Sequence, residues 1–329
     1  MYNRLILPGL IVISGLTFQS CGGAGVTDPS IDLYAGTFAG LAISKNGGRT
    51  WTTKTTSNGL GANDIRAVVE KDGTLYVGSN GGGFSFSGDG GNSWTNKGTA
   101  DGLGSETVFR IFPDQNGTFY AGTSGGFSIS TDGGLSWVNK TTAHGLGGVS
   151  IRDIDVSGST IRVATNSGMS TSLTGGNNWT NQDGEVGLAG DNVFAVRMTG
   201  NNVYVGTTTG LSVSSDGGNN YSTKTTANGL GSNNINCITL SGSAMLVGTN
   251  GGLSVSTDGG ATFINKTTAD GLGGNTVTSV SVSNAVLYVG TNNGLSISSD
   301  GGVTWTNKLP ADGLPSTFIS TVFARFISL

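Results

Sequence analysis

The sequence is poor in the residues that build disulfide frameworks and common catalytic centres. Its 329 residues include only two cysteines and one histidine. A zinc site needs several Cys or His ligands, and a Ser-His-Asp triad needs a histidine beside its nucleophile. We place His144 in a turn and interpret Cys237 as a small buried hydrophobic residue. We therefore expect no metal and no cofactor.

Charged residues and helical patterns are also scarce. Charged residues make up 11% of the chain, the net charge is -4, and 59 residues are glycine. No segment after residue 20 has the 3.6-residue period of an amphipathic helix, so short strands joined by glycine-rich turns must form the core. The mild acidity and the scattered basic residues argue against nucleic acid as a partner.

Residues 1–20 have the pattern of a bacterial export signal. Arg4 supplies a positive charge, and the apolar run over residues 5–18 is shorter than a membrane-spanning helix requires. The run ends in Phe18-Gln19-Ser20-Cys21-Gly22. This ending resembles the lipobox of bacterial lipoproteins, especially the looser boxes of spirochaetes, although Phe18 and Gln19 differ from the usual Leu and small residue.

The lipobox resemblance implies a lipid anchor. We expect residues 1–20 to be a lipoprotein signal peptide, Cys21 to carry the lipid, and residues 21–31 to form a tether. Several acyl chains would hold the protein firmly on a membrane. The alternative is an ordinary secretory signal in which Cys21 is incidental. Because Cys21 has this explanation, we expect no disulfide with Cys237.

One phrase, which we call the box, recurs seven times about 42 residues apart. Its fullest form is Ser-x-Asp-Gly-Gly-x-(Thr/Ser)-Trp, and the copies span residues 44–51, 87–94, 130–137, 172–179, 214–221, 256–263 and 298–305. Five boxes end in tryptophan: Trp51, Trp94, Trp137, Trp179 and Trp305. The third position is Asp in five boxes (Asp89, Asp132, Asp216, Asp258, Asp300), Asn46 in the first and Thr174 in the fourth.

The box chemistry is that of a tight turn. Asp or Asn accepts backbone N–H groups, glycine supplies a positive φ, and the aromatic residue packs on a sheet. A feature repeated seven times is a structural part, because an active site occurs once. Since Thr174 offers a single hydroxyl oxygen, we predict that the fourth box forms the weakest turn.

A second marker recurs with the same period, as in Tyr288-Val289-Gly290-Thr291. Periods of 40–50 residues with four strands each indicate propeller blades. We predict an all-β fold over residues 32–329, a seven-bladed β-propeller of four-stranded antiparallel blades. The first marker, at residues 33–37, has no inner strand before it, and one inner-strand pattern, at residues 318–326, follows the last blade. We therefore expect the C-terminal strand to join the N-terminal blade and close the ring.

Lysine recurs three residues after the box aromatic residue. The slot holds Gln182 in the fourth repeat and lysine in the others: Lys54, Lys97, Lys140, Lys224, Lys266 and Lys308. These positions fall on the outermost strands, where a charge discourages pairing between edges. Binding of an anionic surface is the alternative.

The boxes resemble the Asp-box (BNR) repeat of sialidases, some plant-polysaccharide glycosidases, sortilin-like receptors and photosystem assembly propellers. The segment of residues 269–277 with residues 287–295 also resembles the propeller repeat of two-component sensor ectodomains. Together the resemblances cover residues 33–326. They imply a β-propeller and say little about activity, since one fold hosts many functions.

The sequence offers little for a sialidase. That resemblance would imply an arginine triad and a tyrosine nucleophile, but the tyrosines mostly occupy repeat positions. Phe109-Arg110-Ile111-Phe112-Pro113 is similar to the sialidase Phe-Arg-Ile-Pro motif with one extra residue. Other glycosidases need two carboxylates about 5–10 Å apart. Asp153 and Asp155, on one face of a strand, are the best candidates, unless they pair with Arg152 and Arg197.

The repeats differ most in their inner strands. Four adjacent inner strands carry a charged sector, which we propose lines an axial channel: Arg66, Arg110, Arg152, Asp153, Asp155 and Arg197. This sector could bind an anionic group or a partner's side chain, or its members could pair with one another. Connections between strands are short and uniform, whereas function on a rigid scaffold is carried by elaborated loops.

We therefore expect a non-enzymatic binding or scaffolding lipoprotein, a monomer in the bacterial cell envelope with a protein or glycan partner. A carbohydrate-active hydrolase and a sensor-like ligand-binding module are the alternatives.

Overall fold

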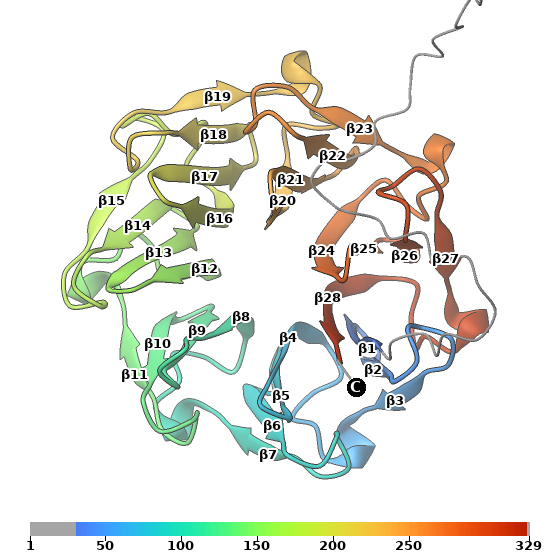
Figure 1. Cartoon of the computed structure of the whole chain (residues 1–329). Coiled ribbons are helices and arrows are strands. Elements are labelled where there is room, and N and C mark those ends of the chain that lie inside the picture. Colours follow the sequence, from blue (N-terminus) through green and yellow to red (C-terminus); the bar gives the residue numbers. More distant parts are fainter. Residues whose placement is uncertain (1–30, 328–329) are drawn as a thin grey trace, which may run out of the picture.

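The computed structural model describes residues 31–327 as a ring of seven four-stranded antiparallel sheets, each of which is one blade (Figure 1). The predicted seven-bladed β-propeller is confirmed. Its first strand begins at Ile31, the last residue of the predicted tether. The predicted signal peptide, Cys21 and the rest of the tether lie outside the described residues.

The blades follow one another in chain order around the ring. From the axis outward, blade 1 consists of β28 (Ile319–Phe326), β1 (Ile31–Thr37), β2 (Gly40–Ser44) and β3 (Thr52–Lys54). Blade 2 consists of β4 (Ile65–Lys71), β5 (Thr74–Ser79), β6 (Phe84–Ser87) and β7 (Thr95–Lys97). Blade 3 consists of β8 (Val108–Pro113), β9 (Phe119–Thr123), β10 (Gly126–Ser130) and β11 (Val138–Lys140).

The remaining blades continue the pattern. Blade 4 consists of β12 (Ile151–Ser157), β13 (Thr160–Thr165), β14 (Gly168–Ser172) and β15 (Thr180–Gln182). Blade 5 consists of β16 (Val193–Thr199), β17 (Asn202–Thr207), β18 (Leu211–Ser214) and β19 (Ser222–Lys224). Blade 6 consists of β20 (Ile235–Ser241), β21 (Ala244–Thr249), β22 (Gly252–Ser256) and β23 (Ile264–Lys266), and blade 7 of β24 (Val277–Ser283), β25 (Val286–Thr291), β26 (Gly294–Ser298) and β27 (Thr306–Lys308).

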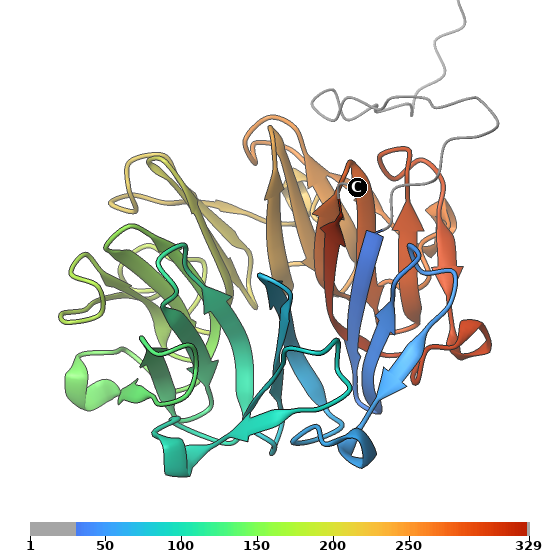
Figure 2. The same cartoon turned by 60° about the horizontal axis from the view of Figure 1, so that its bottom comes forward.

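Short 3-10 helices occupy the loops that lead from an outer strand to the next inner strand. They are η1 (Thr56–Asn58), η2 (Thr99–Asp101), η3 (Thr142–His144), η4 (Thr226–Asn228), η5 (Thr268–Asp270) and η6 (Pro310–Asp312). Figure 2 shows these loops along the lower side of the ring, where the inner strands begin. We call this side the loop face. Over residues 31–327, no helix has the length and apolar character needed to cross a membrane.

The ring closes as the repeats predict. Strand β28 pairs with β1 from Ile31↔Phe326 to Thr37↔Ile319. It also lies against β24 of blade 7 and β4 of blade 2. The two ends of the described chain therefore meet in one blade, so that blade 1 presents a complete inner strand to both neighbours.

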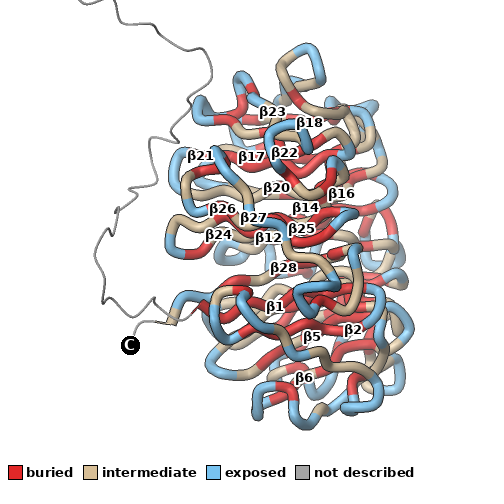
Figure 3. Tube along the Cα trace, turned by 90° about the vertical axis from the view of Figure 1, so that its right-hand side faces the viewer, coloured by how far each residue is buried: buried red, intermediate tan, exposed pale blue. Residues whose placement is uncertain are grey.

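The hydrophobic core is divided among the blade interfaces. Seven clusters of buried residues each join two consecutive blades, and Figure 3 shows the buried segments inside the ring. In the cluster between blades 2 and 3, the buried ring of Phe84 meets Trp137 edge to face at 5.0 Å between centroids. The box aromatic residue of one blade thus packs on the blade before it. Stability depends on every interface, and therefore on the complete ring.

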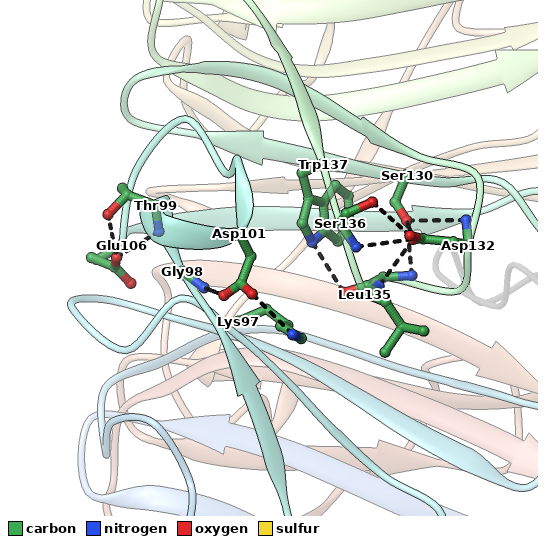
Figure 4. A network of polar contacts seen from close by, with 11 residues as sticks. Lys97, Gly98, Thr99, Asp101, Glu106, Ser130, Asp132, Leu135, Ser136 and Trp137 are labelled. Carbon is green, nitrogen blue, oxygen red and sulfur yellow. Dashed lines mark hydrogen bonds and ion pairs between the residues drawn. The ribbon is translucent and has the colours of Figure 1, made fainter.

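The boxes form the predicted turns, as Figure 4 shows for the third one. Asp132 Oδ1 accepts the N–H groups of Leu135 (3.1 Å) and Ser136 (3.0 Å), and Oδ2 accepts the Ser136 hydroxyl (2.6 Å). Gly134 has φ +91°, a conformation that residues with a Cβ rarely adopt, and its carbonyl accepts Trp137 Nε1–H (3.2 Å). These bonds hold the aromatic ring in place for the interface.

The fourth box is bonded less completely than its neighbours. Thr174 Oγ1 accepts one backbone N–H, from Asn178 at 3.0 Å. Asp216, in the fifth box, accepts the N–H groups of Asn219 (2.9 Å) and Asn220 (3.0 Å), and also the Asn220 side chain (2.7 Å). Both boxes continue with Gly-Gly-Asn-Asn. The difference therefore comes from the missing carboxylate.

Replacing Thr174 with Asp is expected to stabilise the protein. Because the fifth box shows the bonds that a carboxylate makes in the same surroundings, the gain should be about 1 kcal/mol. In a chain of this size, that gain raises the melting temperature by about 1.5–2 °C. Thermal unfolding followed by circular dichroism measures the change. Thr174→Ala is the matched control and should melt below the wild type; a Thr174→Asp variant that also melts lower would contradict the prediction.

The box carboxylates also make stability depend on pH. Hydroxyl and backbone N–H donors hold the pKa values of Asp89, Asp132 and Asp258 well below the ordinary range. A folded-state pKa below the unfolded value gives stability that is present above the unfolded pKa and is lost as pH falls. We expect a constant melting temperature from about pH 7 to 5 and a progressive fall below about pH 4. The Thr174→Asp variant, with one more such carboxylate, should lose its advantage in the same range. A melting temperature that stays constant down to about pH 2 would contradict this expectation.

Candidate functional site

The seven inner strands share an irregular start on the loop face. The first residue of each is fully buried, and the pairing with the second strand shifts immediately after it. This shift is a β-bulge, which leaves the second residue outside the pairing and reverses the faces of all later residues. The second positions, in order from blade 2 around the ring to blade 1, are Arg66, Phe109, Arg152, Phe194, Asn236, Thr278 and Ser320.

Polar residues of blades 6, 7 and 1 join neighbouring inner strands. At the second position, Asn236 Nδ2 donates to the Val277 carbonyl of the next blade at 2.9 Å. Thr278 and Ser320 each donate in the same way to the first residue of the following inner strand. These side chains satisfy backbone carbonyls that face another blade, so their role is structural.

Two serines of blade 7 satisfy backbone N–H groups of blade 1. Ser279 Oγ, at the third position of β24, accepts the N–H of Val322 at 3.1 Å. Ser281 Oγ, at the fifth position, accepts the N–H of Ala324 at 3.1 Å. In a blade without charges at the third and fifth positions, these two side chains therefore accept backbone N–H groups of the next blade.

The candidate carboxylates of blade 4 perform the same task. Asp153 Oδ2 accepts the N–H of Val196 at 3.1 Å, and Asp155 Oδ2 accepts the N–H of Met198 at 2.6 Å. Asp153 and Asp155 occupy the third and fifth positions of β12, as the two serines do in β24. Both therefore join blades 4 and 5.

Asp153 is also the centre of a charged cluster. Its Oδ1 lies 3.1 Å from Arg110 Nε of blade 3, and its Oδ2 lies 2.6 Å from Arg197 Nη1 of blade 5. The Asp153 side chain is 7% exposed, against 38% for Arg110 and 18% for Arg197. The carboxylate is thus shared by three blades, and both of its oxygens are occupied. With Asp155, the cluster holds two positive and two negative charges.

The surroundings shift the pKa values within this cluster. Burial raises the pKa of Asp155, against the attraction of Arg197. Desolvation lowers the pKa of Arg110, whereas the carboxylates of Asp153 and Asp155 outweigh desolvation and raise the pKa of Arg197. Asp153 is engaged by two guanidinium groups, and both Asp153 and Asp155 accept backbone N–H groups of blade 5.

Arg66 and Arg152 lie apart from this cluster. Arg66 bonds to Asp64 at 2.8 Å, and Arg152 Nη1 donates to Asn192 at 2.5 Å. Arg152 and Arg197 were the predicted partners of Asp153 and Asp155. Arg197 forms an ion pair with Asp153, whereas Arg152 forms none with either carboxylate. The bulge is the reason, because it moves the second residue away from the level of the third. The predicted charged sector is therefore two groups. One is the cluster of Arg110, Asp153, Asp155 and Arg197 between blades 3, 4 and 5. The other consists of Arg66 and Arg152 at the start of the inner strands on the loop face, a region that we call the rim.

The interpretation of Cys237 as a small hydrophobic residue of the core agrees with its position. This residue occupies the third position of β20, is partly buried, and packs against the apolar cluster between blades 6 and 7. Its surroundings raise the pKa of the thiol to about 12, chiefly by desolvation. His144 lies in the predicted turn, within η3, where its Nδ1 faces the N–H of Thr141 at 3.1 Å.

Three aromatic residues at the rim were not predicted from the sequence. Phe38, in the turn from β1 to β2, stacks on Phe318 at 4.4 Å between centroids, with the guanidinium of Arg66 4.9 Å from its ring. The guanidinium of Arg152 lies 4.1 Å from the ring centroid of Phe194. The sequence did distinguish Phe38, because the equivalent position in the other repeats holds a small polar residue: Asn80, Ser124, Asn166, Thr208, Asn250 and Asn292.

Neither a family model nor a curated relative matches the chain. Among the residues that the structure describes, no three His, Cys, Asp or Glu side chains gather as a metal site would require. The geometry of the two charged groups is therefore the main guide to what the protein does.

Solved structures of other propellers resemble the ring. The extracellular domain of a putative one-component system, BT4673 from Bacteroides thetaiotaomicron, aligns with a TM-score of 0.52 and 14% identity over 86% of this chain and 46% of that one. YCF48 bound to a D1 peptide aligns with a TM-score of 0.59 and 18% identity over 80% of this chain and 87% of that one. The GH74 xyloglucanase of Xanthomonas campestris aligns with a TM-score of 0.62 and 14% identity over 84% of this chain and 52% of that one.

At these identities the likeness concerns the fold. The chain spans about half the length of the BT4673 domain and of the xyloglucanase. The three propellers differ in what their names describe, an extracellular domain of a one-component system, a peptide complex and a xyloglucanase, so the architecture does not select a function.

Proposed function

We propose that this protein is a non-enzymatic binding or scaffolding propeller, tethered by a lipid on Cys21 to a membrane of the bacterial envelope. The observation that supports binding over hydrolysis is the use of Asp153 and Asp155 as hydrogen-bond acceptors between blades 4 and 5. A hydrolase would need two carboxylates that are free to face a substrate.

The location and the partner are part of the same proposal. The lipobox-like ending at Cys21 supports a lipid anchor, and the BT4673 neighbour is an extracellular domain of a bacterial protein. YCF48, a propeller of similar size, was solved with a peptide. We propose a protein as the partner and a monomer as the working form.

The test combines a capture experiment with an activity assay. The full chain, carrying an affinity tag, is expressed in a lipoprotein-processing bacterium and recovered from envelope membranes with its partners. We expect one or a few proteins in stoichiometric amounts, and membrane release by Cys21→Ala. Parallel incubation with xyloglucan and other polysaccharides should give no reducing ends. Polysaccharide cleavage by the purified wild-type protein would overturn the proposal in favour of a hydrolase.

A further inference from the structure

The second positions of the inner strands fall into two classes. Asn236, Thr278 and Ser320 donate to a backbone carbonyl of the next blade, whereas Arg66, Phe109, Arg152 and Phe194 do not; Arg152 instead donates to the side chain of Asn192, just before the inner strand of blade 5. Phenylalanine has no polar group to donate, and the two arginines donate to residues that precede an inner strand. Half of the ring on the loop face therefore carries large side chains that satisfy no backbone carbonyl of the next blade.

Arg152 is the cation of this rim without a counter-ion. It lies half-buried on the ring of Phe194 and donates to the neutral Asn192. No carboxylate among residues 31–327 forms an ion pair with it, whereas Arg66 has Asp64. Removing a cation from water without an anion is unfavourable, and desolvation lowers the pKa of this guanidinium. An anionic ligand would supply the missing partner.

The part of the rim on blade 1, three blades from Arg152 around the ring, is apolar. Phe38 is 45% exposed and lies stacked on Phe318, with planes inclined by 13°. Arg66 covers the Phe38 ring at 4.9 Å, and its charge is balanced by Asp64. The rim thus combines an apolar surface on blade 1 with an unbalanced, oriented guanidinium on blade 4.

These features favour a peptide over a neutral sugar. Sugars stack on open aromatic faces and bond to hydroxyl or carboxylate groups, but here a guanidinium group lies over one face of Phe194 and of Phe38, and Phe38 is also stacked on Phe318, so that the exposed part of this pair offers apolar contact without an open face. The aromatic residues of the rim are all phenylalanine, without a polar atom. A guanidinium held over a ring keeps N–H groups available for paired bonds to a carboxylate.

We propose that the rim of the loop face binds an acidic peptide segment of a partner protein, with a carboxylate on Arg152 and an apolar side chain on Phe38 and Phe318. This inference rests on the proposed binding function and names its site and the chemistry of its ligand.

The test begins with a random dodecapeptide library displayed on phage and selected against the full chain. We expect enriched peptides to combine Asp or Glu with Leu, Phe or Trp. A synthetic copy of the best peptide, measured by fluorescence anisotropy, should bind at least about tenfold more weakly to Arg152→Asn and to Phe38→Asn. Its copy with amides in place of the carboxylates should lose a similar factor. Both substitutions place in the rim the residue that other repeats carry there, Asn236 and Asn80.

Lys224→Gln is the matched control, because it removes one positive charge at the end of outer strand β19. It should bind the peptide as the wild type does, and melting curves of all variants should confirm folding. No enriched peptide, enriched peptides without acidic residues, or equal binding by Arg152→Asn would each overturn the inference. Binding of oligogalacturonate that Arg152→Asn abolishes, in the absence of peptide binding, would assign the rim to an acidic glycan and overturn it as well.

The capture experiment separates this inference from the proposed function. If a partner protein is recovered equally well by wild type, Arg152→Asn and Phe38→Asn, the protein is a binding propeller that uses another surface. If no partner is recovered by any form, the proposed function itself fails.

Discussion

Deletion of residues 316–329 is expected to abolish folding. The deletion removes β28, the inner strand of blade 1, which pairs with β1 along its whole length. Ile319 and Val322 are buried in the interface with blade 7, and burial of each such side chain contributes about 1.5–3 kcal/mol. The backbone groups of β1 would also lose their partners. Together these losses approach the whole stability of a typical domain, about 5–15 kcal/mol.

A permuted chain provides the control for the deletion. Ile31 pairs with Phe326, so the end of β28 lies beside the start of β1 and a short hairpin loop can join them. A chain that begins with residues 315–327 and continues through such a loop into residues 31–314 should refold the ring. Circular dichroism and size-exclusion chromatography would show an aggregated or unfolded deletion and a monomeric permutant. A deletion that retains the melting temperature of the full chain would refute this account of closure.

Repetition made the fold predictable. Seven copies of each marker fixed the order of the strands, and the unpaired marker at residues 33–37 with the extra strand pattern at residues 318–326 predicted the closure. Element ends were less exact: the strand expected from the marker at residues 33–37 begins at Ile31, and the inner strand expected at residues 318–326 begins at Ile319. The six 3-10 helices are too short to show a period, although the capping threonine and the glycine after each mark most of them, as in Thr55 and Gly59 around η1.

The site was only partly predictable, because one bulge per inner strand changes which residues share a level. In a regular strand, residues 151–155 would alternate between the two faces of the sheet. That arrangement made Arg152 and Arg197 the expected partners of Asp153 and Asp155. The bulge leaves Arg152 on the rim, while Asp153 meets Arg110 and Arg197. Such a shift depends on pairing with the neighbouring strand, which no pattern within a single strand reveals. The stacking of Phe38 on Phe318 joins the two ends of the chain, and only the closed ring brings them together.

The charged cluster predicts a large effect for one residue. Asp153→Ala should be among the most destabilising single substitutions in the inner strands, because it leaves Arg110 and Arg197 without their shared anion and the Val196 N–H without an acceptor. Breaking a buried ion pair from one side costs about 3–5 kcal/mol. Chemical denaturation with urea should therefore show a clearly lower midpoint at an unchanged slope.

Asp155→Ser is the matched control for Asp153→Ala. Ser281 fills the same position in blade 7 and accepts the equivalent N–H, so Asp155→Ser should cost about 1 kcal/mol or less. A second substitution tests the charge argument directly. Arg197→Thr, which copies Thr239 of blade 6, should recover part of the stability lost in Asp153→Ala, because only Arg110 then lacks a partner. If the two substitutions simply add, the loss in Asp153→Ala comes from the missing N–H acceptor and packing, and the cluster is not held together by charge.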